Sequence, residues 1–396
     1  METNTKLETY LKDTRFPYIS DVNVNMGSGY EDIFKKIEFL INFKYSIRPE
    51  FRLVYSLFRQ TELITSNNPI IIYDRYLGET FHIMTKTLLL PHDEIKAFAF
   101  SCKLIAETLR KSGQFEKALP YACLAHENMN KIYSNDTNKL FYISSKYFEE
   151  ESSIKLSDRV EQKNIFECHL NTTHDISLIS EVFIVFHEIS HYLMKNNKLD
   201  DYIKSYTDEC EKCVELWGGF FQTLITNTNV PRSCHKVFNS ESFKNNIIEE
   251  MLCDRLAIEH TVTLFESIFD HDYIALAILF CSLHLRWFKH IDLIANYPNE
   301  TTQYYDTMIR SYFIREILGK ANLNSNLVCA SSVISDQYQY VFYSRENSLR
   351  DLANNKSVVE KCKSVYGKYI DSDLITASII IDSLIGWNTY NGKIDL

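Results

Sequence analysis

One segment limits the possible folds of this chain more than any other. Residues 182–193 are almost entirely apolar, yet they contain His187, Glu188 and His191. On an α-helix, residues four positions apart lie on the same face, so the two imidazoles would project side by side. A helix that is apolar nearly all round buries polar side chains only where they have partners. The segment therefore predicts a buried helix with a specific polar site on one face.

The rest of the sequence also favours helices. Only 10 glycines and 7 prolines occur among the 396 residues, which leaves few breaks. None of them falls between Asp175 and Leu193, so a continuous helix is expected there, with Asp175 or Ser177 as its N-cap. We expect a mainly α fold with a small β component.

The pentapeptide from His187 to His191 has the parts of a hydrolytic zinc site. Neutral imidazole nitrogens are common zinc ligands, and a carboxylate next to the first histidine can reach a water bound to the metal. The alternative is a buried helix whose histidines are satisfied by hydrogen bonds in the core. That alternative suits a single histidine better than two at this spacing with Glu188 between them. Zn²⁺ is therefore the expected cofactor.

A second predicted helix supplies a third ligand. Glu250 and Asp254 are again four residues apart, and Glu250 follows His191 by 59 positions (250 − 191). Glu250 would complete a site of two histidines and one glutamate, with water in the fourth position. Asp254, one turn further on, would accept the other N–H of His187 and fix its tautomer. Glu249 has no acid four residues later and is interpreted as a solvated or substrate-facing residue.

This arrangement resembles that of the gluzincin metallopeptidases. His-Glu-x-x-His at 187–191, followed by Glu-x-x-x-Asp at 250–254, is most similar to the branch that holds the heat-shock and prenyl-protein-processing peptidases. Cys253 stands where that branch usually has alanine. The resemblance implies a zincin-like metallopeptidase domain. It also implies that His187, His191 and Glu250 are the zinc ligands. By the same resemblance, Glu188 is the general base and Asp254 is a supporting carboxylate.

The expected function is that of a zinc-dependent peptidase. Glu188 would act as general base on a zinc-activated water, and a further donor would stabilise the developing oxyanion. His290 and Arg310 are the candidates for that donor. Two other functions stay open: a helical interaction or regulatory protein with an inactive or coincidental motif, and a zinc hydrolase acting on a non-peptide substrate.

Composition indicates a reducing compartment. The ten cysteines have no disulfide-like spacing, and the first residues are polar without a signal-peptide core. The longest apolar stretch, residues 273–281, is too short to span a bilayer. The net charge of −10 argues against nucleic acid as a main partner. We expect a cytoplasmic protein without a membrane span, acting on a protein or peptide substrate.

A second, structural zinc site is a weaker hypothesis. Cys210 and Cys213 could join Cys234 and His235, because the ligand types suit zinc. However, Cys234 and His235 are adjacent, and adjacent ligands chelate poorly. Two incidental thiols in a helix are therefore the favoured interpretation of the first pair.

The hydrophobic content of 45% is ample for two domains. We divide the chain into a helical region, residues 1–138, and a zincin-like domain with a helical C-terminal part, residues 139–396. In the first region, helices are expected at 30–44 and 50–65, and a short strand or extended segment at 69–74.

Residues 96–132 are expected to form a helical hairpin. Small residues and Gly113 at the turn resemble a tetratricopeptide-type unit, and an ordinary hairpin explains them equally well. Residues 141–147 are predicted as a strand that could pair with an extended substrate, with 338–343 as an alternative strand.

Overall fold

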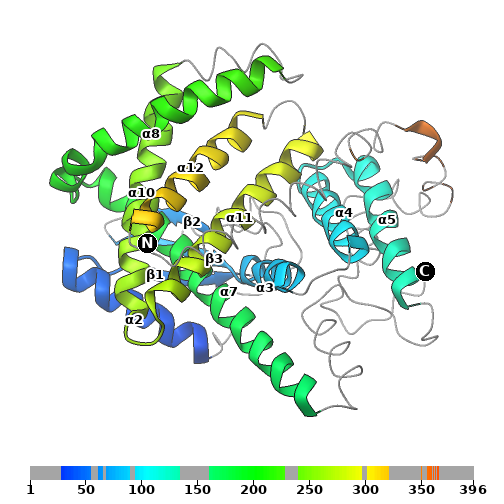
Figure 1. Ribbon diagram of the computed structural model, residues 1–396, viewed down its shortest axis with the longest axis horizontal. Helices are drawn as coiled ribbons and strands as arrows, with labels where there is room; N and C mark the ends of the chain where they lie inside the picture. The colour runs from blue at the N-terminus through cyan, green and yellow to red at the C-terminus, as the bar shows by residue number, and fades with distance from the viewer. Residues whose placement is uncertain are drawn as a thin grey trace. The chain divides into compact units, whose positions relative to one another are not determined.

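A computed structural model gives the fold of this protein (Figure 1). It describes residues 28–54, 61–65, 68–89, 94–133, 160–227, 240–296, 301–320, 349, 355–358, 360, 362 and 364. Helices dominate these residues, so the expected mainly α fold with a small β component is confirmed. The helices are α2 (Ser28–Tyr45), α3 (Arg75–Leu89), α4 (Glu94–Lys111), α5 (Phe115–Tyr133), α7 (Val160–Lys195), α8 (Asp200–Asn227), α10 (Glu241–Phe265), α11 (His271–Asn296) and α12 (Thr301–Lys320).

The described residues fall into two compact units, neither of which is continuous in sequence. The first unit takes its residues from 1–81, 175–286 and 301–331, and the second from 82–174, 287–300 and 332–396. Helices α3, α7 and α11 therefore contribute residues to both. The domain boundary predicted between residues 138 and 139 lies outside the described residues, so that division stays a prediction.

The strands belong to the first unit. β1 (Glu50–Val54), β2 (Thr61–Ile64) and β3 (Ile70–Asp74) form one sheet with β3 in the centre, parallel to β1 and antiparallel to β2. The strand expected at 69–74 is confirmed, whereas the helix expected at 50–65 is wrong. Phe51 and Leu53 alternate with more exposed residues along β1, which is a strand pattern. Pairing with the fully buried β3 decides the conformation of this segment.

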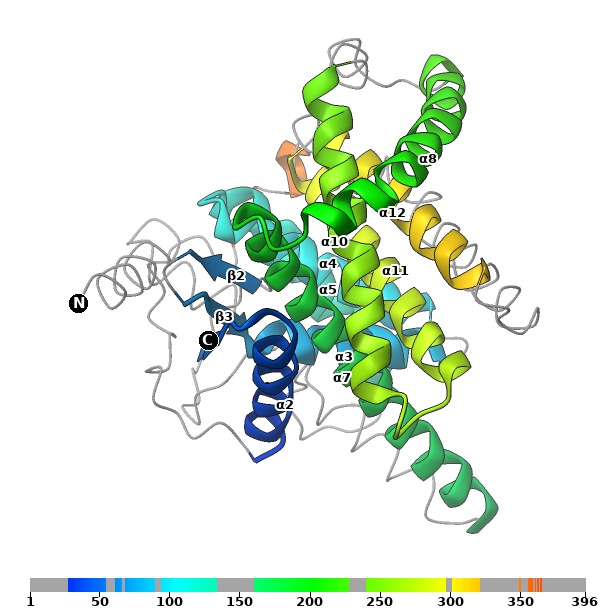
Figure 2. The same ribbon diagram turned by 90° about the vertical axis from the view of Figure 1, so that its left-hand side faces the viewer.

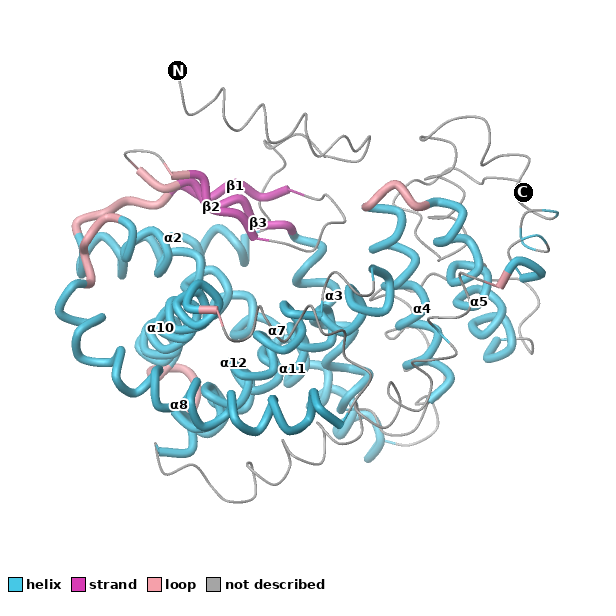
Figure 3. Tube along the Cα trace, turned by 90° about the horizontal axis from the view of Figure 1, so that it is seen from above, coloured by secondary structure: helices cyan, strands magenta, loops and turns pink. Residues whose placement is uncertain are grey.

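Helix α2 packs on this sheet, and the helix expected at residues 30–44 is confirmed. The ring of Phe34 stacks on Phe51 of β1, with centroids 4.5 Å apart and planes 3° from parallel. Figure 3 shows α2 running beside the magenta strands. The helix ends where Ser46 takes a positive φ of 57° and its N–H donates to the carbonyl of Asn42.

Helix α7 carries the His187–His191 segment and is longer than predicted. It begins at Val160, so Asp175 and Ser177 lie inside it and the predicted N-cap at either residue is wrong. Residues 160–174 also lack glycine and proline, so nothing in the sequence stops the helix there. At its other end, Asn197 has a φ of 53°.

The bonds beyond the end of α7 are those of a Schellman motif. Asn197 N–H donates to Met194 O (3.1 Å), and Lys198 N–H donates to Leu193 O (3.0 Å). These bonds satisfy carbonyls that the end of the helix would leave open. The helix therefore stops at a defined residue, one turn after the second histidine.

Helix α10 carries Glu250 and Asp254, and it begins at a defined cap. The side chain of Ser240 accepts a hydrogen bond from Phe243 N–H at 3.2 Å. The helix packs against α8 and α12, as well as against α2. Figure 2 shows the same helices from another side. These contacts fix the position of α10 and therefore of Glu250 and Asp254.

In the second unit, α4 and α5 pack as a helical hairpin, as predicted (Figure 1). Gly113 makes the turn with a φ of 74°. Gly113 N–H donates to Arg110 O, and Gln114 N–H donates to Leu109 O, which is again a Schellman motif. The tetratricopeptide-like character of the hairpin stays a prediction. The strands predicted at 141–147 and 338–343 lie outside the described residues.

Two helical segments, His174–Lys195 and His271–Asn296, are long and apolar enough to cross a membrane. The core helices of soluble proteins pass the same test of length and composition. In the most apolar windows of these segments, 78% and 67% of the residues are buried inside the structure. The expected absence of a membrane span stays a prediction.

Candidate metal centre

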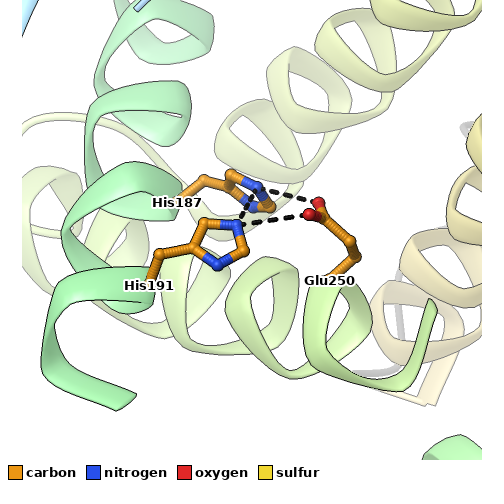
Figure 4. Close-up of side chains that lie close together, drawn as sticks. All are labelled: His187, His191 and Glu250. Carbon is orange, nitrogen blue, oxygen red and sulfur yellow. Dashed lines mark hydrogen bonds and ion pairs between the residues drawn. The ribbon is translucent and has the colours of Figure 1, made fainter. Parts of the chain in front are cut away.

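The two histidines of α7 and Glu250 of α10 face one another, as Figure 4 shows. The Nε2 atoms of His187 and His191 are 3.2 Å apart. One carboxylate oxygen of Glu250 lies 3.2 Å from Nε2 of His187, and the other lies 3.4 Å from Nε2 of His191. Among the described residues, these side chains form the group that could hold a metal ion.

The geometry suits zinc. Tetrahedral zinc bound at about 2.0–2.1 Å by nitrogen and oxygen has its ligand atoms about 3.3 Å from one another. The two Nε2 atoms are 3.2 Å apart, and each has one oxygen of Glu250 nearby, Oε2 at 3.2 Å from His187 and Oε1 at 3.4 Å from His191. Two imidazoles and one carboxylate are also a common ligand set for a zinc ion that keeps a water in its fourth position.

Each imidazole has a carboxylate on its other side. Nδ1 of His187 is 2.9 Å from Oδ1 of Asp254, at an angle that falls short of a good hydrogen bond. Nδ1 of His191 is 3.1 Å from Oε1 of Glu249. A carboxylate on Nδ1 leaves Nε2 free to bind a metal, and this pairing is common in zinc sites. The structure thus brings Asp254 to the position that its spacing predicted.

Arg310 of α12 joins the same cluster. Its Nε and Nη2 atoms donate to the two oxygens of Asp254, both at 2.8 Å, and Nη1 lies 2.7 Å from Oε2 of Glu250. The sequence predicted Arg310 near the site as an oxyanion donor. The structure directs the guanidinium at the carboxylates that surround the histidines, so it can fix Asp254 and Glu250 in position, and its role as an oxyanion donor stays a prediction.

These contacts decide the charge of the cluster. Burial alone would raise the pKa of the Asp254 and Glu250 carboxyl groups, but Arg310 and His187 hold both pKa values below the usual range. Burial would likewise lower the pKa of His187. The carboxylates of Asp254 and Glu250 outweigh it and raise that pKa to about 10. A metal ion and a proton therefore compete for His187.

Glu188 lies beside this group, next to the first histidine. Its side chain is half-buried, and burial raises its pKa above the usual range, although His187 and His191 act in the opposite direction. No hydrogen bond between described residues occupies its carboxylate. A carboxylate in this state, next to a metal position, can accept a proton from a water molecule.

Other predicted site residues do not belong to this group. His290 is a buried residue of the part of α11 that belongs to the second unit, and its predicted role as an oxyanion donor stays a prediction. Cys210 and Cys213 are buried in α8, which runs unbroken past Gly218. The other suggested ligands of that second zinc site, residues 234 and 235, lie outside the described residues.

Sequence reasoning missed the contact between Glu249 and His191. The carboxylate of Glu249 is 43% exposed, so solvent also reaches it, yet one oxygen lies within bonding distance of the imidazole. A signal was present in the sequence. Two adjacent acids on one helix project about 100° apart, and two histidines four residues apart offer two ring N–H groups that carboxylates can accept.

Comparisons with known proteins add no relative. No family model matches the chain, no curated protein is similar to it, and no solved structure resembles it. The function is therefore inferred from the geometry of the site and from its two sequence motifs.

Proposed function

We propose that this protein is a zinc-dependent peptidase. The observation that carries the proposal is the convergence of two imidazole nitrogens and one carboxylate at 3.2–3.4 Å from one another, with a carboxylate behind each imidazole. An ordinary buried helix has no need for this arrangement. The resemblance of the two motifs to those of gluzincins supports the same function.

In this proposal, His187, His191 and Glu250 hold the zinc. When bound, zinc activates a water molecule and polarises the scissile carbonyl. Glu188 takes the proton from that water and passes it to the leaving nitrogen. Its raised pKa favours the first step, because a stronger base takes the proton from the water more readily.

Asp254 and Arg310 keep the ligands in position. Asp254 orients His187, and Arg310 holds Asp254 and Glu250 through three contacts of 2.7–2.8 Å. This engagement supports a role for Arg310 in the metal centre rather than at the oxyanion. We retain His290 as the candidate oxyanion donor.

The proposal extends to the setting of the enzyme. We propose a gluzincin that acts on a protein or peptide substrate in the cytoplasm, without a nucleic-acid partner or a membrane span. The net charge of −10 and the scattered cysteines support this setting.

Metal analysis of the purified protein tests the proposal first. Wild type is expected to carry about one zinc per chain, the stoichiometry of such a site, and His187→Ala is expected to lose it. The zinc-loaded protein is then incubated with a mixed peptide library, with and without a chelator. Cleavage that the chelator abolishes supports the proposal.

The other outcomes separate the two alternatives. Protein that neither carries nor takes up zinc would point to a helical interaction protein. Zinc-loaded protein that leaves every peptide intact but hydrolyses an ester or amide of another class would point to a non-peptide hydrolase.

A further inference from the structure

The two imidazoles of the metal centre are supported in the same way but by unequal partners. Each has Nε2 directed at Glu250 and Nδ1 near a second carboxylate, which is Asp254 for His187 and Glu249 for His191. Asp254 is completely buried and held by Arg310. Glu249 is 43% exposed, and it contacts only His191 among the polar partners that the described residues provide.

Helix geometry explains how neighbouring acids serve one histidine. Residues that follow each other on a helix project about 100° apart. Glu249 and Glu250 of α10 therefore reach different edges of the His191 ring, the first at Nδ1 (3.1 Å) and the second at Nε2 (3.4 Å). His191 is thus held between two consecutive residues of one helix.

We propose that Glu249 is a positioning residue that orients His191 as a zinc ligand. The inference rests on the proposed zinc site, and it concerns metal affinity rather than peptide cleavage. When Nδ1–H donates to the carboxylate of Glu249, the lone pair of Nε2 is left for the metal, and the ring becomes more basic. The tautomer follows from this network of contacts.

The exposure of Glu249 sets the size of the effect. Loss of a carboxylate behind a metal-binding histidine typically weakens metal binding by about 10- to 100-fold. Water can replace Glu249, because the side chain is 43% exposed. We therefore expect an effect near the lower limit.

The test measures zinc affinity by competition with a chromogenic chelator. Glu249→Leu removes both charge and acceptor and is expected to bind zinc about tenfold more weakly than wild type. Glu249→Gln keeps an acceptor oxygen and is expected to lie between the two. Glu266→Gln is the matched control, because it removes the same charge from an exposed position at the end of α10.

A spectrum adds a readout that a general loss of stability would not change. With Co²⁺ in place of zinc, the visible absorption bands of Glu249→Leu are expected to shift, because the orientation of one imidazole ligand changes. The bands of Glu266→Gln are expected to match those of wild type.

The outcomes separate this inference from the proposed function. If wild type cleaves peptides with zinc but Glu249→Leu has the affinity and spectrum of the control, the positioning role is wrong and the peptidase stands. If wild type binds no zinc, both fail together. Weaker binding with a shifted spectrum in Glu249→Leu alone supports the inference.

Discussion

Two acidic clusters include side chains of α7, and the pKa values of their carboxyl groups shift in opposite directions. Around Glu181, the Tyr73 hydroxyl donates to the carboxylate at 2.6 Å, and the Tyr30 hydroxyl also bonds to it. Burial raises the pKa of Glu181 to about 7, and these two bonds only moderate the shift. At the metal centre, Asp254 is completely buried and Glu250 is partly buried, yet the effect of burial is outweighed and the pKa values of both carboxyl groups fall.

The difference lies in the partners. Tyrosine hydroxyls are neutral, so they stabilise an ionised carboxylate only modestly, whereas Arg310 and His187 bring positive charge into direct contact with theirs. One cluster therefore holds a proton near neutral pH, and the other holds negative charge. Only the second kind of cluster can support a divalent cation.

Glu188 shares a feature with each of the two clusters, and its substitution has the largest expected effect. Burial raises its pKa, as for Glu181, yet it borders the charged centre. Glu188→Gln is expected to lower peptide hydrolysis by at least about a hundredfold, the smaller end of general-base contributions. Steady-state kinetics on a peptide found in the library screen measures the loss.

Zinc content must be unchanged for this result to count. The amide of Glu188→Gln occupies the same space, and Glu188 is not among the ligands, so about one zinc per chain is expected in both proteins. Turnover equal to wild type would show that Glu188 is not the base.

Arg310→Leu breaks the charged cluster from its other side. It leaves Asp254, which is completely buried, without its guanidinium partner, so that only His187 remains beside the carboxylate. Removal of one partner from a buried ion pair costs about 3–5 kcal/mol of stability. Urea denaturation in the presence of a chelator measures this in the metal-free protein.

An exposed pair gives the matched control. Arg52 contacts Glu50 at 3.0 Å, with 36% and 48% of these side chains exposed. Arg52→Leu is expected to cost less than about 1 kcal/mol. Equal losses in the two variants would mean that Arg310 does not neutralise the buried centre.

The sequence predicted the metal group because two ligands lie in one short motif and the family resemblance connects that motif with a second one, which holds Glu250. Spacings of four residues bring side chains to one face of a helix whatever the rest of the fold does, as for His187 with His191. The role of Arg310 could not be predicted in the same way. Its contact with Asp254 joins residues 56 positions apart, and no local pattern reports which of several basic residues arrives there.

The fold shows the same limit. Helices α2, α7 and α10 follow from local patterns, whereas residues 50–54 and 61–64 form strands β1 and β2 that pair with β3. The Glu181 cluster was also missed, since its partner Tyr73 is 108 residues away. Non-local pairing decides such elements, and spacing along the chain does not reveal it.

The Glu181 cluster predicts an unusual pH dependence. The pKa of the Glu181 carboxyl group is about 7 in the folded protein, compared with an ordinary value of 4.5. Between these two pH values, the folded state therefore binds more protons than the unfolded state. Stability from this group is therefore complete below pH 4.5 and declines as the pH rises towards 7. A shift of this size corresponds to a decline of at most about 3 kcal/mol.

Glu181→Gln should remove this decline, because an amide does not titrate. We expect the variant to gain stability relative to wild type as the pH rises from ~5 to ~8, because this range includes the raised pKa of Glu181. Urea denaturation across that range, with wild type in parallel, measures the difference. A constant difference at every pH would show that Glu181 is already ionised in the folded protein.

The smallest effect tests how tightly the Glu181 cluster is packed. A Cβ added to Gly78 of α3 would overlap the carboxylate of Glu181. Gly78→Ala therefore forces Glu181 away from Tyr73, and overpacking of this kind costs about 1–3 kcal/mol. Better helix propensity offsets up to about 1 kcal/mol of that loss.

Two further variants make the cause visible in urea denaturation. In a Glu181→Ala background the overlap is gone, so Gly78→Ala should become neutral or stabilising, and the double-mutant cycle should show strong coupling. Gly218→Ala in α8 is the control, since no atom lies within 4 Å of its added Cβ, and it should stabilise the protein slightly. If Gly78→Ala behaves like Gly218→Ala in the wild-type background, Glu181 is not held against α3. The contrast between the Glu181 cluster and the metal centre would then fail, because only the carboxylates of the metal centre would be held by fixed partners.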